Sequence, residues 1–308
     1  MPMVFGALVP VFLLIVLGHG LRRVMLTDDK PWSGIEQLVY YVLFPALLID
    51  TLSRANLSAV PVAGVGGALL LAVVAMSALC LVLRPWLARR FGVDGPAFSS
   101  VFQGATRWQT FVALSVAGNL YGDVGITLAS VAMVAMIPLL NVFSVGVLAH
   151  YAAPMRLRWP SILLAIARNP LIWACLIGLA INLAQIPVPR PLHDFADALG
   201  RCSLALGLLV VGAGLHLEGL RKPKPAALIT VGLKLAVMPL IATGLGLGFG
   251  LSGTNLAVVA CCASVPSASN GYVLARQMGG DAALLAQILT LQTSLAVFTM
   301  PLFIALAA

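Results

Sequence analysis

Long apolar stretches alternate along the chain with short gaps in which polar and charged residues collect. A helix rises about 1.5 Å per residue, so a run of about 20 apolar residues crosses the hydrocarbon core of a bilayer. The pattern predicts ten such helices, called spans one to ten, over residues 3–21, 34–52, 60–83, 96–118, 124–149, 168–186, 195–217, 225–249, 253–275 and 282–305. The gaps are too short for a soluble domain. The sequence therefore predicts an all-α integral membrane protein.

Composition agrees with this class. Hydrophobic residues make up 61% of the 308 and charged residues 9%, and the mean hydropathy of +1.04 lies outside the soluble range. No basic segment of a cleaved signal peptide precedes span one, so we expect this helix to stay in the membrane. The five cysteines and four histidines lack the spacing of metal, redox or disulfide sites. We expect no metal and no cofactor.

Positive charges predict an orientation. The odd-numbered gaps contain Arg22, Arg23, Lys30, Arg84, Arg89, Arg90, Arg156, Arg158, Arg168, Arg221, Lys222, Lys224 and Arg276, whereas the even-numbered gaps contain only Arg54, Arg190 and Arg201. Cytoplasmic loops carry the excess of Lys and Arg, so the odd gaps are predicted to be cytoplasmic and both termini non-cytoplasmic. Topology thus accounts for the net charge of +8, and membrane lipids are expected as partners, not nucleic acid.

The two halves of the chain resemble each other when one is shifted by 158 residues. Residues 91–95 (FGVDG) then fall on 249–253 (FGLSG), and 122–123 (GD) on 280–281 (GD). This alignment places span four on span nine, so each repeat holds five helices and the second must be inverted. Inverted repeats are common in secondary transporters.

Spans four and nine are also the most interrupted. Span four contains QGATRWQT at 103–110, and span nine contains SVPSASNG at 264–271. Polar groups at mid-span are costly unless they face a cavity or another protein segment. Pro266 removes a backbone donor, and Gly104 and Gly271 loosen the helix, so we expect both spans to unwind there. Paired broken helices indicate a transport site.

Unwinding exposes backbone N–H groups at the start of each following half-helix, where they favour an anion. Arg107 adds a guanidinium fork suited to a carboxylate. Neutral hydrogen bonds are expected from Gln109, Thr110, Ser267, Ser269 and Asn270. The alternative is that these polar residues only join neighbouring helices.

Two further ionisable residues lie inside spans. Lys234, near the middle of span eight and before Pro239, is a candidate second positive charge for the substrate, or a support that caps freed carbonyls or pairs with an acid. Asp50, at the outer end of span two, is a candidate for proton coupling, or it simply reaches water or Arg54.

Short motifs in a fixed order resemble bacterial members of the auxin efflux carrier family, with the malonate transporter branch as the nearest comparison. They are 11–18 (VFLLIVLG) with Arg22, 41–48 (YVLFPALL), 107–109 (RWQ), 121–122 (YG), 265–270 (VPSASN), Ala275, 279–281 (GGD) and 300–301 (MP). The resemblance implies ten helices in two inverted five-helix repeats, as in bile acid sodium symporters, with helices four and nine crossing where they unwind.

The resemblance also implies a scaffold of spans one, two, six and seven and a moving part of spans three, four, five, eight, nine and ten. The repeats are expected at 1–150 and 168–308, with a linker at 151–167 in which a short interfacial helix is one option. Family members are often dimers and lie in the inner membrane of bacteria. Plant members carry Asn at both crossovers, whereas this chain has Gln109 and Asn270. Sodium-coupled relatives use an acid in the second crossover, where this chain has none.

Together these features predict a secondary transporter of small mono- or dicarboxylate anions, malonate-like or auxin-like, that works by alternating access. One alternative is a receptor or channel on the same scaffold. The other is a membrane-embedded enzyme, which is disfavoured because the sequence shows no nucleophile motif, zinc motif or paired intramembrane acids.

Overall fold

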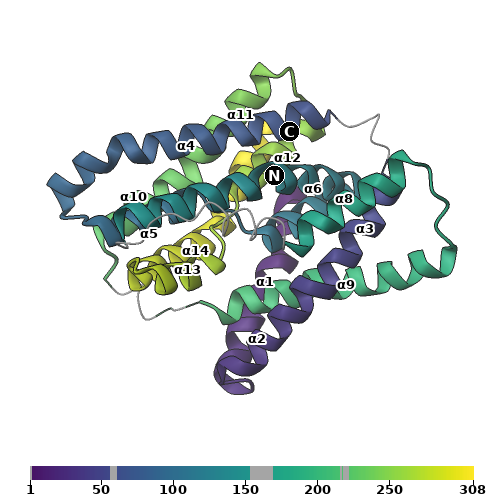
Figure 1. The fold of residues 1–308 in the computed structure, drawn as a ribbon, viewed down its shortest axis with the longest axis horizontal. Coiled ribbons are helices and arrows are strands. Elements are labelled where there is room, and N and C mark those ends of the chain that lie inside the picture. Colours follow the sequence, from purple (N-terminus) through teal and green to yellow (C-terminus); the bar gives the residue numbers. More distant parts are fainter. Residues whose placement is uncertain (1, 56–60, 153–168, 216, 218–221) are drawn as a thin grey trace.

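The computed structural model describes residues 2–55, 61–152, 169–215, 217 and 222–308. Within these ranges the regular structure is helical throughout (Figure 1). The predicted linker at 151–167 lies almost wholly outside the described residues, and so does its optional interfacial helix.

The helices follow the ten predicted spans closely. In chain order they are α1 (Pro2–Val24), α2 (Asp29–Leu38), the π-helical turn η1 (Val39–Leu43), α3 (Phe44–Arg54), α4 (Val62–Phe91), α5 (Gly95–Thr106), α6 (Thr110–Tyr151), α8 (Pro170–Leu183), α9 (Arg190–Ala213), α10 (Pro225–Gly232), the π-helical turn η4 (Leu233–Val237), α11 (Met238–Gly248), α12 (Gly253–Ser264), α13 (Asn270–Met278) and α14 (Ala282–Ala307). Among the described residues, seven helical stretches are long and apolar enough to cross a membrane, one of them the stretch Gly95–Tyr151 that joins α5 and α6. The chain is a multi-pass membrane protein.

Gly and Pro divide the longer helices. α6 contains the second part of span four and all of span five. Gly122, between the two, has φ 58° and ψ −142°, so the chain kinks there. The turns η1 and η4 each end just before a helix with proline at its second position, Pro45 or Pro239. Proline cannot donate to the preceding turn, which explains the local π-helical pairing. Lys234 lies in the π-helical turn η4, which ends one residue before the helix that carries Pro239 at its second position.

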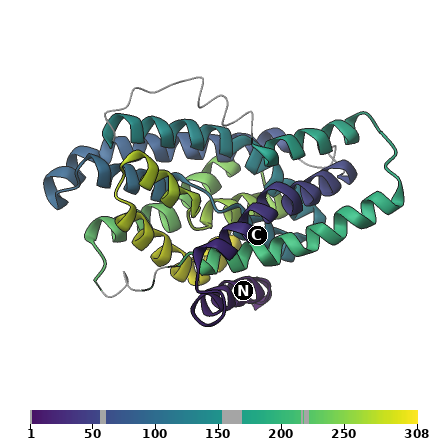
Figure 2. The same ribbon diagram turned by 60° about the horizontal axis from the view of Figure 1, so that its bottom comes forward.

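Two groups of helices pack among themselves. α9 packs on α1 and α3, and α3 packs on α8. In the other group α4 packs on α6 and α11, and α12 packs on α11 and α14. Figures 1 and 2 show α3, α8 and α9 extending to one side of the molecule and α4, α5, α13 and α14 to the other.

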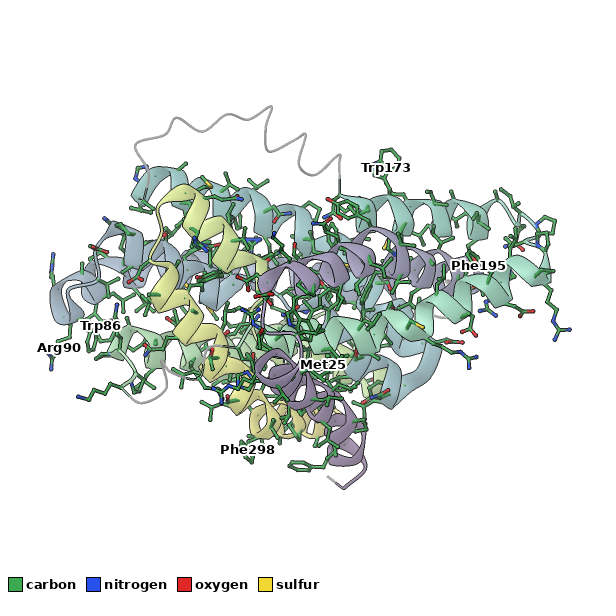
Figure 3. All side chains as sticks on the ribbon, turned by 90° about the horizontal axis from the view of Figure 1, so that it is seen from below. Met25, Trp86, Arg90, Trp173, Phe195 and Phe298 are labelled. Atoms are coloured by element: carbon green, nitrogen blue, oxygen red, sulfur yellow. The ribbon has the colours of Figure 1, made fainter. Side chains whose placement is uncertain are left out.

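The outer surface is apolar, as a lipid environment requires. Trp173, Phe195 and Phe298 lie on the outside of the helix bundle (Figure 3) and are 54%, 63% and 68% exposed. The buried side chains are mostly apolar, but they include polar ones such as Gln103, Arg107 and Gln292. Some polar groups therefore lie inside the bundle, where each needs a partner.

Candidate functional site

The two predicted helix breaks are present and lie against each other. Residues 107–109 separate α5 from α6, and residues 265–269 separate α12 from α13. Val265 ends α12 in an extended conformation (φ −66°, ψ 151°) because the residue before a proline disfavours the helical region. The backbone N–H of Gln109 donates to the carbonyl of Pro266 at 3.1 Å, and the Trp108 indole donates to the carbonyl of Cys262 at 2.8 Å.

A buried glutamine that sequence reasoning missed ties both breaks to α14. Gln292 accepts a hydrogen bond from the backbone N–H of Ser267 at 3.0 Å and donates to the carbonyl of Gly104 at 2.8 Å. The Ser267 hydroxyl donates to the same carbonyl. These contacts satisfy backbone groups that the broken helices leave without an intrahelical partner. The signal for Gln292 in the sequence is a glutamine near the middle of span ten, a span that also contains Gln287 and several threonines.

Arg107 is buried at the first break and has only neutral partners among the described residues. Its Nε donates to Asn270 Oδ1 at 3.2 Å, its Nη1 to Gln103 Oε1 at 3.4 Å and its Nη2 to Asn141 Oδ1 at 3.3 Å. The guanidinium carries five N–H groups. One N–H on each terminal nitrogen is therefore left without a described acceptor. Sequence reasoning did not find Gln103 or Asn141 as partners.

A cavity of about 800 Å³ opens beside the breaks. Its walls come from α2, η1, the break at 107–109, both ends of α6, the start of α8 and the segment from the second break through α13. The lining residues are Ser33, Glu36, Gln37, Tyr40, Tyr41, Arg107, Trp108, Gln109, Thr110, Phe111, Ile137, Leu140, Asn141, Val145, Ala149, Asn169, Leu171, Ala268, Ser269, Asn270, Val273, Leu274, Gln277 and Met278.

Five of the predicted binding residues line this cavity, namely Arg107, Gln109, Thr110, Ser269 and Asn270. Gln109 Nε2 also lies 3.4 Å from Ser269 Oγ, so the two breaks contact each other through side chains as well as backbone. α6 and α13 begin at Thr110 and Asn270, so the positive ends of both helix dipoles lie at the cavity.

Ser267 and Lys234 are not among the lining residues. Lys234 is fully buried in η4, and its Nζ has no hydrogen-bond partner among the described residues. No carbonyl cap or acidic partner of Lys234 is therefore seen in the described part of the chain. Its functional role stays a prediction.

Of the three residues predicted to interrupt the spans, Pro266 lies in the second break, whereas Gly104 is helical in α5 and Gly271 is helical in α13, each close to a break. A Cβ on Gly104 would lie 2.7 Å from Ile288 Cγ2 and 2.8 Å from Thr230 Cγ2. A Cβ on Gly271 would lie 3.0 Å from Arg107 Cδ. Both glycines are therefore needed for close packing around the breaks, and Pro266 supplies the carbonyl that Gln109 contacts.

Asp50 lies away from the cavity. It is buried in α3, forms an ion pair with Arg54 and lies 2.6 Å from Nδ1 of His193 in α9. The Arg54 contact is one of the two options that the sequence left open. Asp50 thus links α3 to α9, and its part in proton coupling stays a prediction.

Two of the residues that line the cavity are charged, namely Arg107 and Glu36. Glu36 is an exposed residue on the α2 part of the wall. Within the described ranges no three His, Cys, Asp or Glu side chains come together as metal ligands would. The cavity therefore offers one buried positive charge at Arg107, the exposed carboxyl group of Glu36, several amide and hydroxyl groups, and an otherwise apolar and aromatic wall.

The known proteins that this chain resembles are described as membrane transport proteins. A family model described as "Membrane transport protein" matches residues 154–304. An "Uncharacterized transporter" of Methanothermobacter thermautotrophicus is 26% identical over 297 residues, which cover 95% of each chain. A protein of Rhizobium meliloti named "Putative malonate transporter" is 24% identical over 289 residues, which cover 89% of this chain and 86% of the relative.

Proposed function

Since the chain belongs to the auxin efflux carrier family of membrane transport proteins, we propose that it carries small mono- or dicarboxylate anions across a membrane. The family is one of transporters and not of enzymes. The name of the relative from Rhizobium meliloti supports a malonate-like substrate, and the family supports an auxin-like one.

The observation that carries this proposal is the environment of Arg107. A buried guanidinium normally has a carboxylate partner, because an uncompensated charge in the protein interior is costly. Arg107 instead donates to three neutral amide oxygens, and it faces a cavity. The two N–H groups left on its terminal nitrogens suit the two oxygens of one carboxylate. The substrate itself then supplies the missing negative charge.

Neutral groups complete the proposed site. Gln109, Thr110, Ser269 and Asn270 lie on the cavity wall within the two breaks, so they can bind a second oxygen or a polar substituent of the substrate. Ser267 is already engaged by Gln292 and Gly104, and we assign it to holding the breaks together. We assign Lys234 to support, because it does not line the cavity.

The proposed mechanism is alternating access between two inverted repeats, with α5–α6 and α12–α13 crossing at their breaks. Backbone geometry supports the repeat. Gly95 and Gly253 begin α5 and α12, Thr106 and Ser264 end them, and each pair is 158 residues apart. Gly92 and Gly250, at the same separation, both have positive φ, 64° and 73°.

We further propose that α1, α2, α3, α8 and α9 form a scaffold and that the other helices move against it. The packing of α9 on α1 and α3, and of α12 on α11 and α14, supports this division. The cavity has one wall from α2, η1 and α8 and the other from α6, α13 and the breaks. A relative movement of the two groups would therefore change access to Arg107.

The walls of the cavity also indicate which side is open. They include the second half of α2, the end of α6, the start of α8 and the end of α13, all of which lie close to odd-numbered gaps. The charge bias predicts that these gaps are cytoplasmic and the termini non-cytoplasmic. Phe111, at the edge of the cavity, packs on Phe44, with ring centroids 4.9 Å apart, and on Gly207. We propose that this conformation is open to the cytoplasm and closed to the outside.

A thermal-shift titration tests the proposal. The purified protein in detergent is heated with a panel of small carboxylates at varied sodium concentration and pH, because a ligand that binds the native state raises Tm. We expect a shift with one carboxylate class and none for Arg107→Ala. Arg107→Lys, which keeps the charge but loses the fork, should show an intermediate shift. Shifts with neutral or cationic compounds alone would refute an anion site.

Transport needs a second measurement, because a receptor or channel on this scaffold would also bind the anion. Protein in liposomes loaded with the unlabelled carboxylate should take up the labelled carboxylate by saturable exchange. Binding in detergent without exchange would favour the receptor, and uptake that does not saturate would favour the channel.

A further inference from the structure

The partners of Arg107 share one chemical property. All three are carboxamide oxygens, supplied by Gln103, Asn141 and Asn270. An amide oxygen accepts a hydrogen bond from a guanidinium without cancelling its charge, whereas a carboxylate of nearly the same shape forms an ion pair. The guanidinium of Arg107 is thus held in place through all three of its nitrogens, while its positive charge is not neutralised and can bind an anion.

Asn141 is the partner that lies farthest from both breaks along the chain. It lies in the second part of α6, where Ile137 and Val145, each four residues away, share its helix face on the cavity wall. Asn141 is the polar residue among those that this part of α6 contributes to the wall, and its side chain contacts Arg107 at 3.3 Å. Helix formation and apolar packing do not require an amide there.

We propose that Asn141 determines the charge selectivity of the cavity, by orienting Arg107 without neutralising it. This inference rests on the anion-binding function proposed above. An aspartate at 141 would reach the same Nη2 with a charged oxygen and take the place of the substrate as counter-ion. Arg107 would then have a counter-ion without a ligand, and the site would reject anions. Asn141 is a positioning residue in this scheme, since it acts through Arg107.

The cavity contains a matched control. Asn169 also lines the wall, and its Oδ1 accepts the N–H of Leu171 as the N-cap of α8. Aspartate serves as well as asparagine at an N-cap, so Asn169→Asp adds the same charge to the same cavity while the helix stays capped. No contact between Asn169 and Arg107 is seen among the described residues. Comparison of the two variants separates a local effect on Arg107 from a general negative potential.

The test measures apparent Kd by thermal-shift titration with sodium malonate and sodium phenylacetate, against sodium chloride of equal ionic strength. For a probe that wild type binds, we expect Asn141→Asp to raise Kd at least about tenfold, because its carboxylate competes with the ligand for Arg107. Asn169→Asp should stay within about threefold of wild type, since it leaves Arg107 unpaired with an acid. Asn141→Ala loses the contact that orients Arg107 but adds no charge, so it should raise Kd less than Asn141→Asp does. The ligand-free Tm of Asn141→Asp should equal or exceed that of wild type, which a merely structural defect would not give.

The outcomes are distinguishable. If Asn141→Asp binds the probe as wild type does, or if Asn169→Asp weakens binding equally, the inference is wrong and the anion site stands. If wild type binds neither these probes nor any other carboxylate of the panel, the proposed function fails and the inference fails with it.

Discussion

At the scale of single residues, the site depends on the positive charge of Arg107 and on the neutral side chains that contact it. Arg107 is held by amide oxygens at 3.2–3.4 Å and faces the cavity. Truncating one partner of a buried, hydrogen-bonded charge pair costs about 2 kcal/mol or more, which is roughly 30-fold in Kd. We therefore expect Arg107→Ala to weaken carboxylate binding by at least that factor at a nearly unchanged ligand-free Tm. An unchanged Kd would show that the carboxylate binds elsewhere.

Lys234 gives a second prediction at this scale. It is fully buried and its Nζ has no described partner, so the native state carries the desolvation cost of an unsatisfied donor, about 1–3 kcal/mol. Lys234→Met keeps an unbranched chain of similar length and removes that cost. We expect a higher Tm and an unchanged Kd for the carboxylate that wild type binds. A loss of binding in a folded Lys234→Met protein would instead assign Lys234 to the substrate.

At the scale of the elements, α5 depends on the absence of a side chain at Gly104. A Cβ there would lie 2.7 Å from Ile288 and 2.8 Å from Thr230, so α5 would have to move from α14 and α10. Overpacking of this kind costs about 1–3 kcal/mol. We expect Gly104→Ala to lower Tm and impair exchange in liposomes. Gly232→Ala is the control, because a Cβ at Gly232 would meet nothing within 4 Å, and its Tm should not fall.

At the scale of the whole molecule, the orientation and the open side can be tested together. In a variant whose native cysteines are replaced, a thiol at Gln277 in the cavity should react with an impermeant maleimide from the cytoplasmic side only. A thiol at Ala184, the exposed C-cap of α8 at the predicted outer end of span six, should react from the opposite side only. Labelling of both thiols from one face would contradict the charge-based topology.

Much of the fold follows from local pattern. Hydropathy and span length depend on neighbouring residues, so the ten spans agree with the helices, and Pro266 places the second break correctly. The predicted orientation likewise depends only on the Lys and Arg residues in the gaps between spans. The site was predictable where a residue is anomalous for its span, as Arg107 is. Gln103, Asn141 and Gln292 are less conspicuous, and their roles could not be assigned because each depends on what faces it.

The sequence by itself therefore determined the class of protein, the course of its helices, the place of both breaks and the charged residue at the first. Tertiary structure decided which groups meet. Arg107 contacts Asn270, 163 residues away, and Asn141, 34 residues away. Lys234, in contrast, does not line the cavity. The physical reason is that a helix is fixed by hydrogen bonds and side chains within a few residues, whereas the partners of a buried charge depend on how separate helices pack.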